Sequence, residues 1–181
     1  GVVPPEPRVV AAILRTLEVV HDAGVVHRDI KPSNVVLQGG ARPVLLDFGM
    51  AALHDQRRGR VTEGLVGTLP YLAPEQLRQR RTGADPRTDV YQVGLLLYEL
   101  LTLKPAFDAH ADAGIFELVQ EGRFARPRQV CRAVPRELED VCLRALETRP
   151  ERRYESAAAF REDLERWLGG REAPRASRGG R

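Results

Sequence analysis

The chain has 181 residues, 43% of them hydrophobic and 29% charged, so it has enough apolar material for a buried core and is not expected to be disordered overall. Its 28 basic residues are interspersed with 25 acidic ones, which argues against nucleic acid as a partner. Two cysteines are too few for a disulfide framework, and no apolar run within the chain approaches the about 18 residues that a membrane-spanning helix requires. These features favour one reduced domain in the cytoplasm, either of a soluble protein or of a membrane-anchored receptor.

The first half of the chain predicts one helix, two short strands and a loop. Apolar residues recur at steps of three and four after Pro7, which predicts a helix that has one buried face and ends at Gly24. Two short apolar runs, residues 35–37 and 44–46, are separated by a glycine pair and predict a small β-hairpin. Residues 50–70 contain three glycines and few apolar groups, which indicates a long loop of the kind that often has a function.

The second half is predicted to be helical. Apolar periodicity indicates a long helix over residues 85–102 and further helices near 112–121, 135–147 and 156–168. From Gly169 the sequence is rich in Gly, Arg and Pro and predicts a disordered tail or linker over residues 169–181. The predicted fold class is therefore mainly α with a small β-hairpin, in one domain over residues 1–168.

A polar cluster interrupts an apolar stretch at residues 25–37, which read VVHRDIKPSNVVL. The flanking runs, residues 25–26 and 35–37, are expected to be buried and to hold the loop between them. Within this loop the Asp29 carboxylate is able to orient a hydroxyl group or to accept its proton. The cluster therefore predicts a site for chemistry on a hydroxyl group.

Two further residues supply oxygen ligands of the kind that Mg²⁺ prefers. Asn34 offers an amide oxygen, and Asp47 offers a carboxylate directly after the second predicted strand. Phe48 and Gly49 follow, and the glycine lets the backbone turn there. Asp-Phe-Gly is a weak match by itself. The order His-Arg-Asp-x-Lys-Pro-x-Asn, strand, Asp-Phe-Gly, loop and then Ala-Pro-Glu at residues 73–75 is very specific.

In this order of motifs, the chain resembles the C-terminal lobe of a eukaryotic-type (Hanks-type) serine/threonine protein kinase of the kind that bacteria also encode. The resemblance covers roughly residues 5–168. It implies a protein-kinase-like C-terminal lobe and the transfer of the ATP γ-phosphate to a Ser or Thr hydroxyl of protein substrates. ATP and Mg²⁺ or Mn²⁺ are the cofactors that it implies.

The resemblance also implies chemical roles for five residues. Asp29 would be the catalytic base, and Lys31 would steady the transferred phosphoryl group of the nucleotide. Asn34 and Asp47 would hold the Mg²⁺ ions. Thr68 would contact the catalytic aspartate and lysine.

Regulation by phosphorylation is implied by the arginine that precedes Asp29. Arg28 resembles the arginine of kinases controlled through their activation loop, where the guanidinium binds a phosphate with two hydrogen bonds. Thr62, six residues before Thr68, is the best-placed acceptor of that phosphate. The alternative for Thr62 is an ordinary polar residue of the loop.

Structural roles follow from the same resemblance. His27 would pack beneath the catalytic loop and contact the region around Phe48. Glu75 would form a buried ion pair with Arg153. Asp89 would accept backbone hydrogen bonds from the catalytic loop and would support the site without reacting.

Parts of a kinase are absent from the sequence. A kinase needs a glycine-rich phosphate loop and a strand lysine that pairs with a helix glutamate. The chain has no Gly-x-Gly, and its two lysines are Lys31, in the catalytic loop, and Lys104. We therefore expect the N-terminal lobe to be absent, the apolar groups that would face it to be exposed, and the 181 residues alone to be inactive.

Two interpretations remain open at this stage. The chain is either a fragment of an active kinase whose upper lobe lies upstream of Gly1, or a kinase-derived regulatory or docking module without catalysis. The interpretation as a fragment of an active kinase is favoured because all four residues that the resemblance assigns to phosphoryl transfer are present: Asp29, Lys31, Asn34 and Asp47. A nucleic-acid binder, suggested by the Arg-rich tail, is a third and weaker alternative.

Overall fold

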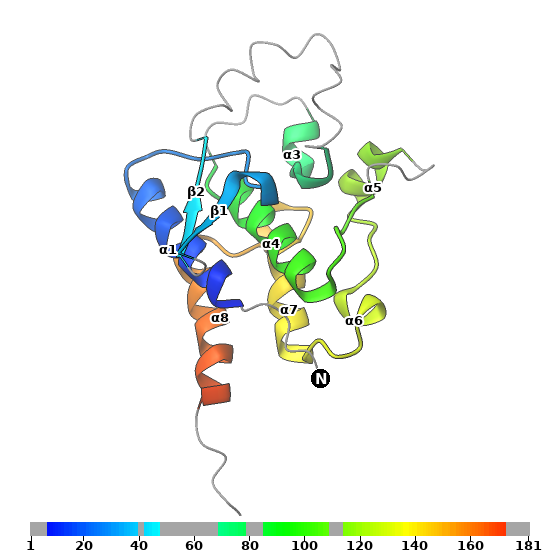
Figure 1. Cartoon of the computed structure of the whole chain (residues 1–181). Helices are drawn as coiled ribbons and strands as arrows, with labels where there is room; N and C mark the ends of the chain where they lie inside the picture. Colours follow the sequence, from blue (N-terminus) through cyan, green and yellow to red (C-terminus); the bar gives the residue numbers. More distant parts are fainter. Residues whose placement is uncertain (1–6, 40–41, 48–68, 79–84, 109–113, 173–181) are drawn as a thin grey trace, which may run out of the picture.

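The computed structural model describes residues 7–39, 42–47, 69–78, 85–108 and 114–172, with the side chains of 171–172 excepted. Its elements are arranged around one long helix (Figure 1). In chain order they are α1 (Pro7–Asp22), the 3₁₀ turn η1 (Pro32–Asn34), β1 (Val35–Gln38), β2 (Arg42–Leu45), η3 (Leu69–Tyr71), α3 (Pro74–Leu77), α4 (Arg87–Thr102), α5 (Ile115–Glu121), α6 (Pro127–Val130), α7 (Arg136–Ala145), η4 (Pro150–Arg152) and α8 (Ala157–Glu172).

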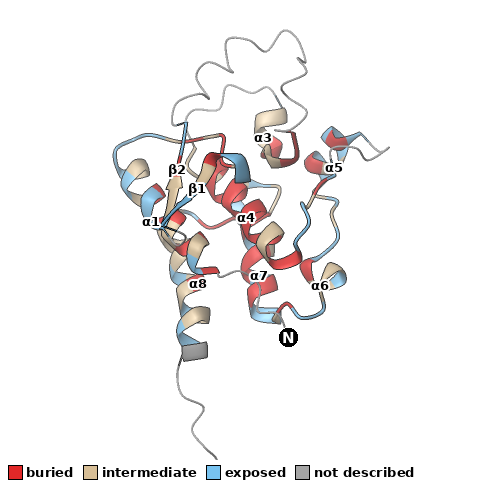
Figure 2. Cartoon of the chain, in the orientation of Figure 1, coloured by how far each residue is buried: buried red, intermediate tan, exposed pale blue. Residues whose placement is uncertain are grey.

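Helix α4 lies at the centre of the fold (Figure 2). Every residue from Thr88 to Tyr98 is buried, and α1, α6, α7 and α8 all pack against this helix. The sequence explains this position, because residues 93–98 read VGLLLY and leave no polar face to turn toward water. Since α4 is surrounded by other elements, the polar residues in its first turns are held in fixed positions inside the core.

Helix α1 has the amphipathic pattern that the sequence predicts. Its buried apolar residues are spaced by three and four positions: Val10, Ile13, Leu14 and Leu17. This face packs against α4 and α8. The helix ends at Asp22, and Gly24 follows with a φ angle of 75°, a left-handed conformation that glycine adopts without strain.

The predicted β-hairpin is present but less buried than expected. β1 and β2 are antiparallel, with Val35 opposite Leu45 and Val36 opposite Val44. Leu45 is buried, whereas Val36 is 47% exposed and Leu37 is 48% exposed. The expectation that residues 35–37 are buried was therefore wrong, as it was for Val25 at 45% exposure.

The physical reason is that strand side chains alternate between two faces. β2 packs on α1, so the face of the hairpin that carries Leu45 is covered. Val36 and Val44 point to the opposite face, where Val36 is exposed. Leu37 shares the face of Leu45, so alternation does not account for its exposure. An apolar run in a two-stranded sheet does not by itself say which face is buried.

Most helices predicted from the sequence are found over the expected residues. The helices expected over 85–102, 112–121 and 135–147 correspond to α4, α5 and α7, although residues 109–113 lie outside the described part. The two one-turn helices α3 and α6 were not predicted; both begin at a proline. The fold is mainly α with a small hairpin, as expected. None of the helices in the described ranges is long and apolar enough to span a bilayer.

The end of the last helix was predicted too early. α8 continues through Gly169 and Gly170 to Glu172, four residues beyond the expected end at Leu168. Each glycine costs about 1 kcal/mol in a helix interior, but a helix already anchored by packing tolerates this cost. The anchor is the face that packs on α1 and α7.

Gly94 is expected to be essential for the packing of α4 on α7. A Cβ atom at Gly94 would lie 2.9 Å from the Ala145 Cβ and 3.1 Å from a Leu146 methyl carbon, so Gly94→Ala forces the two helices apart. Overpacking of this kind costs about 1–3 kcal/mol of unfolding free energy, measurable by chemical denaturation. The control is Gly169→Ala, where nothing lies within 4 Å; it should be neutral or slightly stabilising. Equal effects of the two substitutions would contradict the packing argument.

Candidate active site

The loop between α1 and η1 brings three of the predicted site residues together at one carboxylate. Asp29 is buried at 8% exposure, and the Asn34 Nδ2 donates to the Asp29 Oδ2 at 3.0 Å and to the Asp29 carbonyl at 2.8 Å. The Lys31 Nζ lies 3.0 Å from the same Oδ2. Both side chains therefore hold one oxygen of Asp29. Among the described residues, no hydrogen bond reaches the other oxygen, Oδ1.

The hairpin places Asp47 beside Asn34. The Leu46 N–H donates to the Asn34 carbonyl at 2.9 Å, and Asp47 is the next residue. Asp47 is exposed and has a φ angle of 60°, a left-handed conformation that is uncommon for residues other than glycine. Strained backbone of this kind is concentrated at functional sites.

The side-chain oxygen atoms of these two residues are of the chemical type that binds magnesium. Both hydrogen bonds of the Asn34 side chain use Nδ2, so its carbonyl oxygen Oδ1 is not occupied by them. Mg²⁺ is usually bound by one or two carboxylates together with phosphate oxygens of a substrate. A dedicated protein cage is therefore not required, and no group of three or more His, Cys, Asp or Glu residues suited to a metal occurs among the residues described.

His27 lies beneath the loop and connects it to the hairpin. Its side chain is fully buried, and its Nε2 contacts the Leu46 carbonyl at 2.9 Å. The Nδ1 lies 3.4 Å from the backbone N–H of Asp29, so this nitrogen is the acceptor and Nε2–H is the donor. In this arrangement His27 links the residue before Asp47 to the backbone of Asp29.

Asp89, in the first turn of α4, binds the start of the loop. Its carboxylate is fully buried and accepts the backbone N–H of His27 at 2.9 Å and that of Arg28 at 2.7 Å. The His21 Nε2 lies 2.8 Å from the same carboxylate. The contact with His21 was not predicted from the sequence, in which the four histidines show no regular spacing with acidic residues.

Arg28 adopts a left-handed backbone conformation directly before Asp29. Its φ angle is 64°, so this residue is strained and must be held by its surroundings. Thr62, the residue predicted to carry the phosphate that Arg28 would bind, lies outside the described residues. The same is true of Thr68, Phe48 and Gly49, whose predicted roles remain predictions.

Glu75 and Arg153 form a bidentate ion pair between α3 and the segment before α8. The two guanidinium nitrogens Nη1 and Nη2 donate to the Glu75 carboxylate, each at 2.7 Å. Arg153 also donates to the carbonyls of Glu147 at 2.7 Å and Arg87 at 2.9 Å, and its side chain is fully buried. The Thr88 hydroxyl donates to Glu75 at 3.0 Å. This network attaches α3 to α4 and to the C-terminal part of the chain.

The segment before α3 is attached to α4 by a second contact. The Tyr71 hydroxyl donates to the Glu99 carboxylate at 2.7 Å. Burial, together with this hydrogen bond to a carboxylate, raises the pKa of Tyr71 well above its usual range. Tyr71 therefore remains a protonated donor at neutral pH.

Two glutamines near the loop were missed from the sequence. Gln92 is buried on α4, and Gln76 lies on α3; both donate to the Arg28 carbonyl, at 3.0 and 2.9 Å. The signal that was available is the spacing of Asp89 and Gln92. They are three residues apart, on one face of a helix whose neighbouring residues are apolar.

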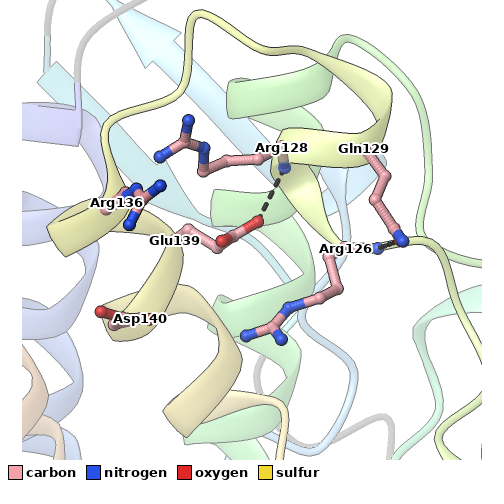
Figure 3. A pocket seen from close by; sticks show the side chains of 6 residues that line it. All are labelled: Arg126, Arg128, Gln129, Arg136, Glu139 and Asp140. Atoms are coloured by element: carbon pink, nitrogen blue, oxygen red, sulfur yellow. Dashed lines mark hydrogen bonds between the residues drawn. The ribbon is translucent and has the colours of Figure 1, made fainter.

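A surface hollow of about 430 Å³ lies elsewhere, at α6 and α7 (Figure 3). Its lining residues are Arg126, Arg128, Gln129, Arg136, Glu139 and Asp140. The Glu139 carboxylate accepts the backbone N–H of Arg128 at 2.8 Å, which fixes α6 on α7. The hollow contains none of the predicted site residues, and most of its side chains are exposed to solvent.

Comparison with known proteins agrees with this geometry. The protein kinase domain matches residues 7–164, from the start of α1 into α8. The chain belongs to the protein kinase family. The matched range includes every residue assigned above to the catalytic loop, the hairpin and the Glu75–Arg153 pair.

The relatives are bacterial serine/threonine-protein kinases. The chain is 36% identical to PknB of Mycobacterium leprae over 97% of its own length and 29% of that protein. It is 39% identical to a probable serine/threonine-protein kinase of Streptomyces coelicolor, over 87% of the chain and 24% of that protein. It is 40% identical to Pkn1 of Myxococcus xanthus, over 87% and 23%. The chain thus spans about a quarter of the length of these relatives.

Removing Arg153 should be far more costly than removing an exposed arginine. Arg153→Met leaves the Glu75 carboxylate and several carbonyls without their donor, so the unfolding free energy should fall by about 3–5 kcal/mol. Arg15→Met is the control: it removes a pair with Glu165 in which the arginine side chain is 68% exposed, and should cost less than about 1 kcal/mol. Urea denaturation measures both, and similar losses would show that the Arg153 network does not carry the expected stability.

Proposed function

We propose that the chain is the catalytic C-terminal lobe of a serine/threonine protein kinase, which transfers the γ-phosphate of ATP to a Ser or Thr hydroxyl of a protein. The observation that carries this proposal is the arrangement at Asp29. Lys31 and Asn34 hold one carboxylate oxygen at 3.0 Å each, while the second oxygen has no partner in the described structure. A residue that served only as a turn or a cap would not need this arrangement.

The roles of the residues follow from their positions. Asp29 Oδ1 orients the substrate hydroxyl and accepts its proton, and Lys31, adjacent to the same carboxylate, places a positive charge where the transferred phosphoryl group gains charge. Asn34 and Asp47 would hold Mg²⁺, which when bound neutralises charge on the nucleotide phosphates. Thr68 completes the contacts of Asp29 and Lys31 in this proposal.

A second lobe is part of the proposal. Lys31 is engaged with Asp29, and Lys104, an exposed residue after α4, is the other lysine of the chain, so neither supplies the strand lysine of a kinase. The exposed face of the hairpin supports the same inference, because Val36 at 47% and Leu46 at 40% exposure are apolar groups that a covering lobe would bury. The full-length protein, in this proposal, includes an N-terminal lobe with the phosphate loop.

Regulation through Arg28 is proposed on the same basis. The backbone of Arg28 is held at both its N–H and its carbonyl, so its position beside Asp29 is defined, and the residue as a whole is half-buried. A phosphate on Thr62 would pair with this guanidinium by two charge-assisted hydrogen bonds.

The alternative is a regulatory or docking module that binds partners without catalysis. It would be favoured by a start codon close to Gly1. The kinase is favoured by a glycine-rich strand pair and a Val-Ala-x-Lys strand encoded roughly 90–110 residues before Asp29. Reading the coding sequence upstream of Gly1 distinguishes the two.

The 181 residues alone are expected to transfer no measurable phosphate. Nucleotide would meet Asn34 and Asp47 without the phosphate loop and the second lysine, and phosphoryl transfer depends on positioning and charge stabilisation. Incubation with radiolabelled ATP, Mg²⁺ and a basic acceptor protein tests this. Incorporation above the background of an Asp29→Asn chain would show that the second lobe is not required.

In the full-length protein, Asp29→Asn should lower kcat by about 10²–10⁴-fold, because the amide cannot accept the hydroxyl proton. The fold should be retained, since the amide oxygen can still accept the hydrogen bond from Asn34. Asp140→Asn, at an exposed position on α7, is the control and should leave kcat unchanged. Steady-state phosphorylation of a protein substrate measures both, and an active Asp29→Asn enzyme would refute the role of Asp29.

A further inference from the structure

Gln92 holds the backbone on both sides of Asp29. The Ile30 N–H donates to the Gln92 Oε1 at 3.0 Å, and the Gln92 Nε2 donates to the Arg28 carbonyl at 3.0 Å. The glutamine is 1% exposed, so water does not compete for these bonds. One amide group therefore fixes the two peptide units that flank the catalytic carboxylate.

The same contacts hold a strained residue in place. Arg28 has a φ angle of 64°, and its N–H is bound by Asp89 at 2.7 Å. Its carbonyl receives two donors, Gln92 at 3.0 Å and Gln76 at 2.9 Å. A left-handed conformation persists only where the surroundings determine it, and here both polar groups of Arg28 are determined.

Gln92 also reaches the segment that follows the predicted activation loop. Its Nε2 lies 3.1 Å from the Tyr71 carbonyl and 3.2 Å from the Gln76 Oε1. That Oε1 in turn accepts the Ala73 N–H at 2.8 Å. The side-chain amide of Gln92 thus donates its two N–H groups to three acceptors. Two of these acceptors, the Tyr71 carbonyl and the Gln76 Oε1, belong to residues 71–76.

We propose that Gln92 is a positioning residue for Asp29 and that, with Gln76, it couples the position of Asp29 to the segment over residues 69–77. This inference rests on the proposed kinase function. An apolar side chain at position 92 would leave the Ile30 N–H and the Tyr71 carbonyl buried without this partner, so the loop would have to move to satisfy them. A displacement of about 1 Å at a catalytic group can cost on the order of 10²-fold in rate.

The first test requires no activity and uses the 181-residue chain. Amide hydrogen exchange is measured residue by residue in Gln92→Met and in the control Thr102→Val. Thr102 is buried on the same helix and loses bonds to the Tyr98 and Lys104 carbonyls, away from the loop. Faster exchange at Ile30 in Gln92→Met, but not in Thr102→Val, is expected. Unchanged exchange at Ile30 overturns the inference.

The second test measures kinetics in the full-length protein. Gln92→Met should lower kcat by about 10–100-fold while the KM for ATP changes less than about twofold, because Gln92 holds the backbone on both sides of Asp29 and contacts none of the residues assigned to the nucleotide. Thr102→Val, which destabilises the same helix, should retain kcat. A Gln92→Met enzyme that is folded and has the wild-type kcat contradicts the proposal.

The third test addresses the coupling between the two glutamines. Gln76→Met, at a half-buried position, removes the second donor to the Arg28 carbonyl. Like Gln92→Met, it should therefore lower kcat. Because both amides bind one carbonyl and each other, the double variant should deviate from additivity in ln kcat. Strict additivity, or an unaffected Gln76→Met enzyme, overturns the coupling, even if Gln92→Met does not fold.

These outcomes separate the two proposals. If the wild-type full-length protein transfers no phosphate, the proposed function fails, while the exchange measurement at Ile30 still decides whether Gln92 holds the loop. If the wild-type protein is active and the variants behave like it, the kinase function stands and the positioning role of Gln92 is refuted.

Discussion

The site depends on one buried carboxylate. Asp89 is fully enclosed in the first turn of α4, and it accepts the backbone N–H groups of His27 and Arg28 at 2.9 and 2.7 Å. A buried charge is tolerated only when it is paired or hydrogen-bonded, and these donors, with His21, satisfy it. The stability of the fold and the geometry of the site therefore rely on the same atoms. The backbone N–H groups of the loop satisfy the Asp89 carboxylate, and this carboxylate holds the loop in position. A change that weakens one of them weakens the other.

Helix α4 gives this interaction its rigidity. Because α1, α6, α7 and α8 all pack against it, α4 cannot shift without disturbing most of the core, and the polar side chains of its first turns act as fixed points. Asp89 and Gln92 reach the loop that carries Asp29 from there, and the Glu75–Arg153 pair attaches α3 to the same region. Segments far apart in the sequence thus meet at a single reference element.

The sequence was sufficient to predict the fold class. Asp29, Lys31 and Asn34, which the structure brings into contact, belong to one contiguous motif, and this is why the sequence predicts them together. It did not reveal Gln92, whose partner Ile30 is 62 residues away and whose own neighbours form no motif. The burial of Val36 was predicted wrongly because alternation defines two faces without saying which one is covered. The end of α8 was missed because local glycine propensity was outweighed by packing upstream.

The uncovered face of the hairpin affects how the chain behaves in solution. Val36, in β1, and Leu46, directly after β2, are both exposed. The two strands pair only with each other in the described structure. Apolar groups next to unpaired strand edges favour contacts between identical molecules. We therefore expect the isolated chain to self-associate as its concentration rises, so that light scattering and apparent melting temperature depend on concentration. In the proposed kinase, the face that the second lobe would cover is also the face through which the isolated chain would self-associate.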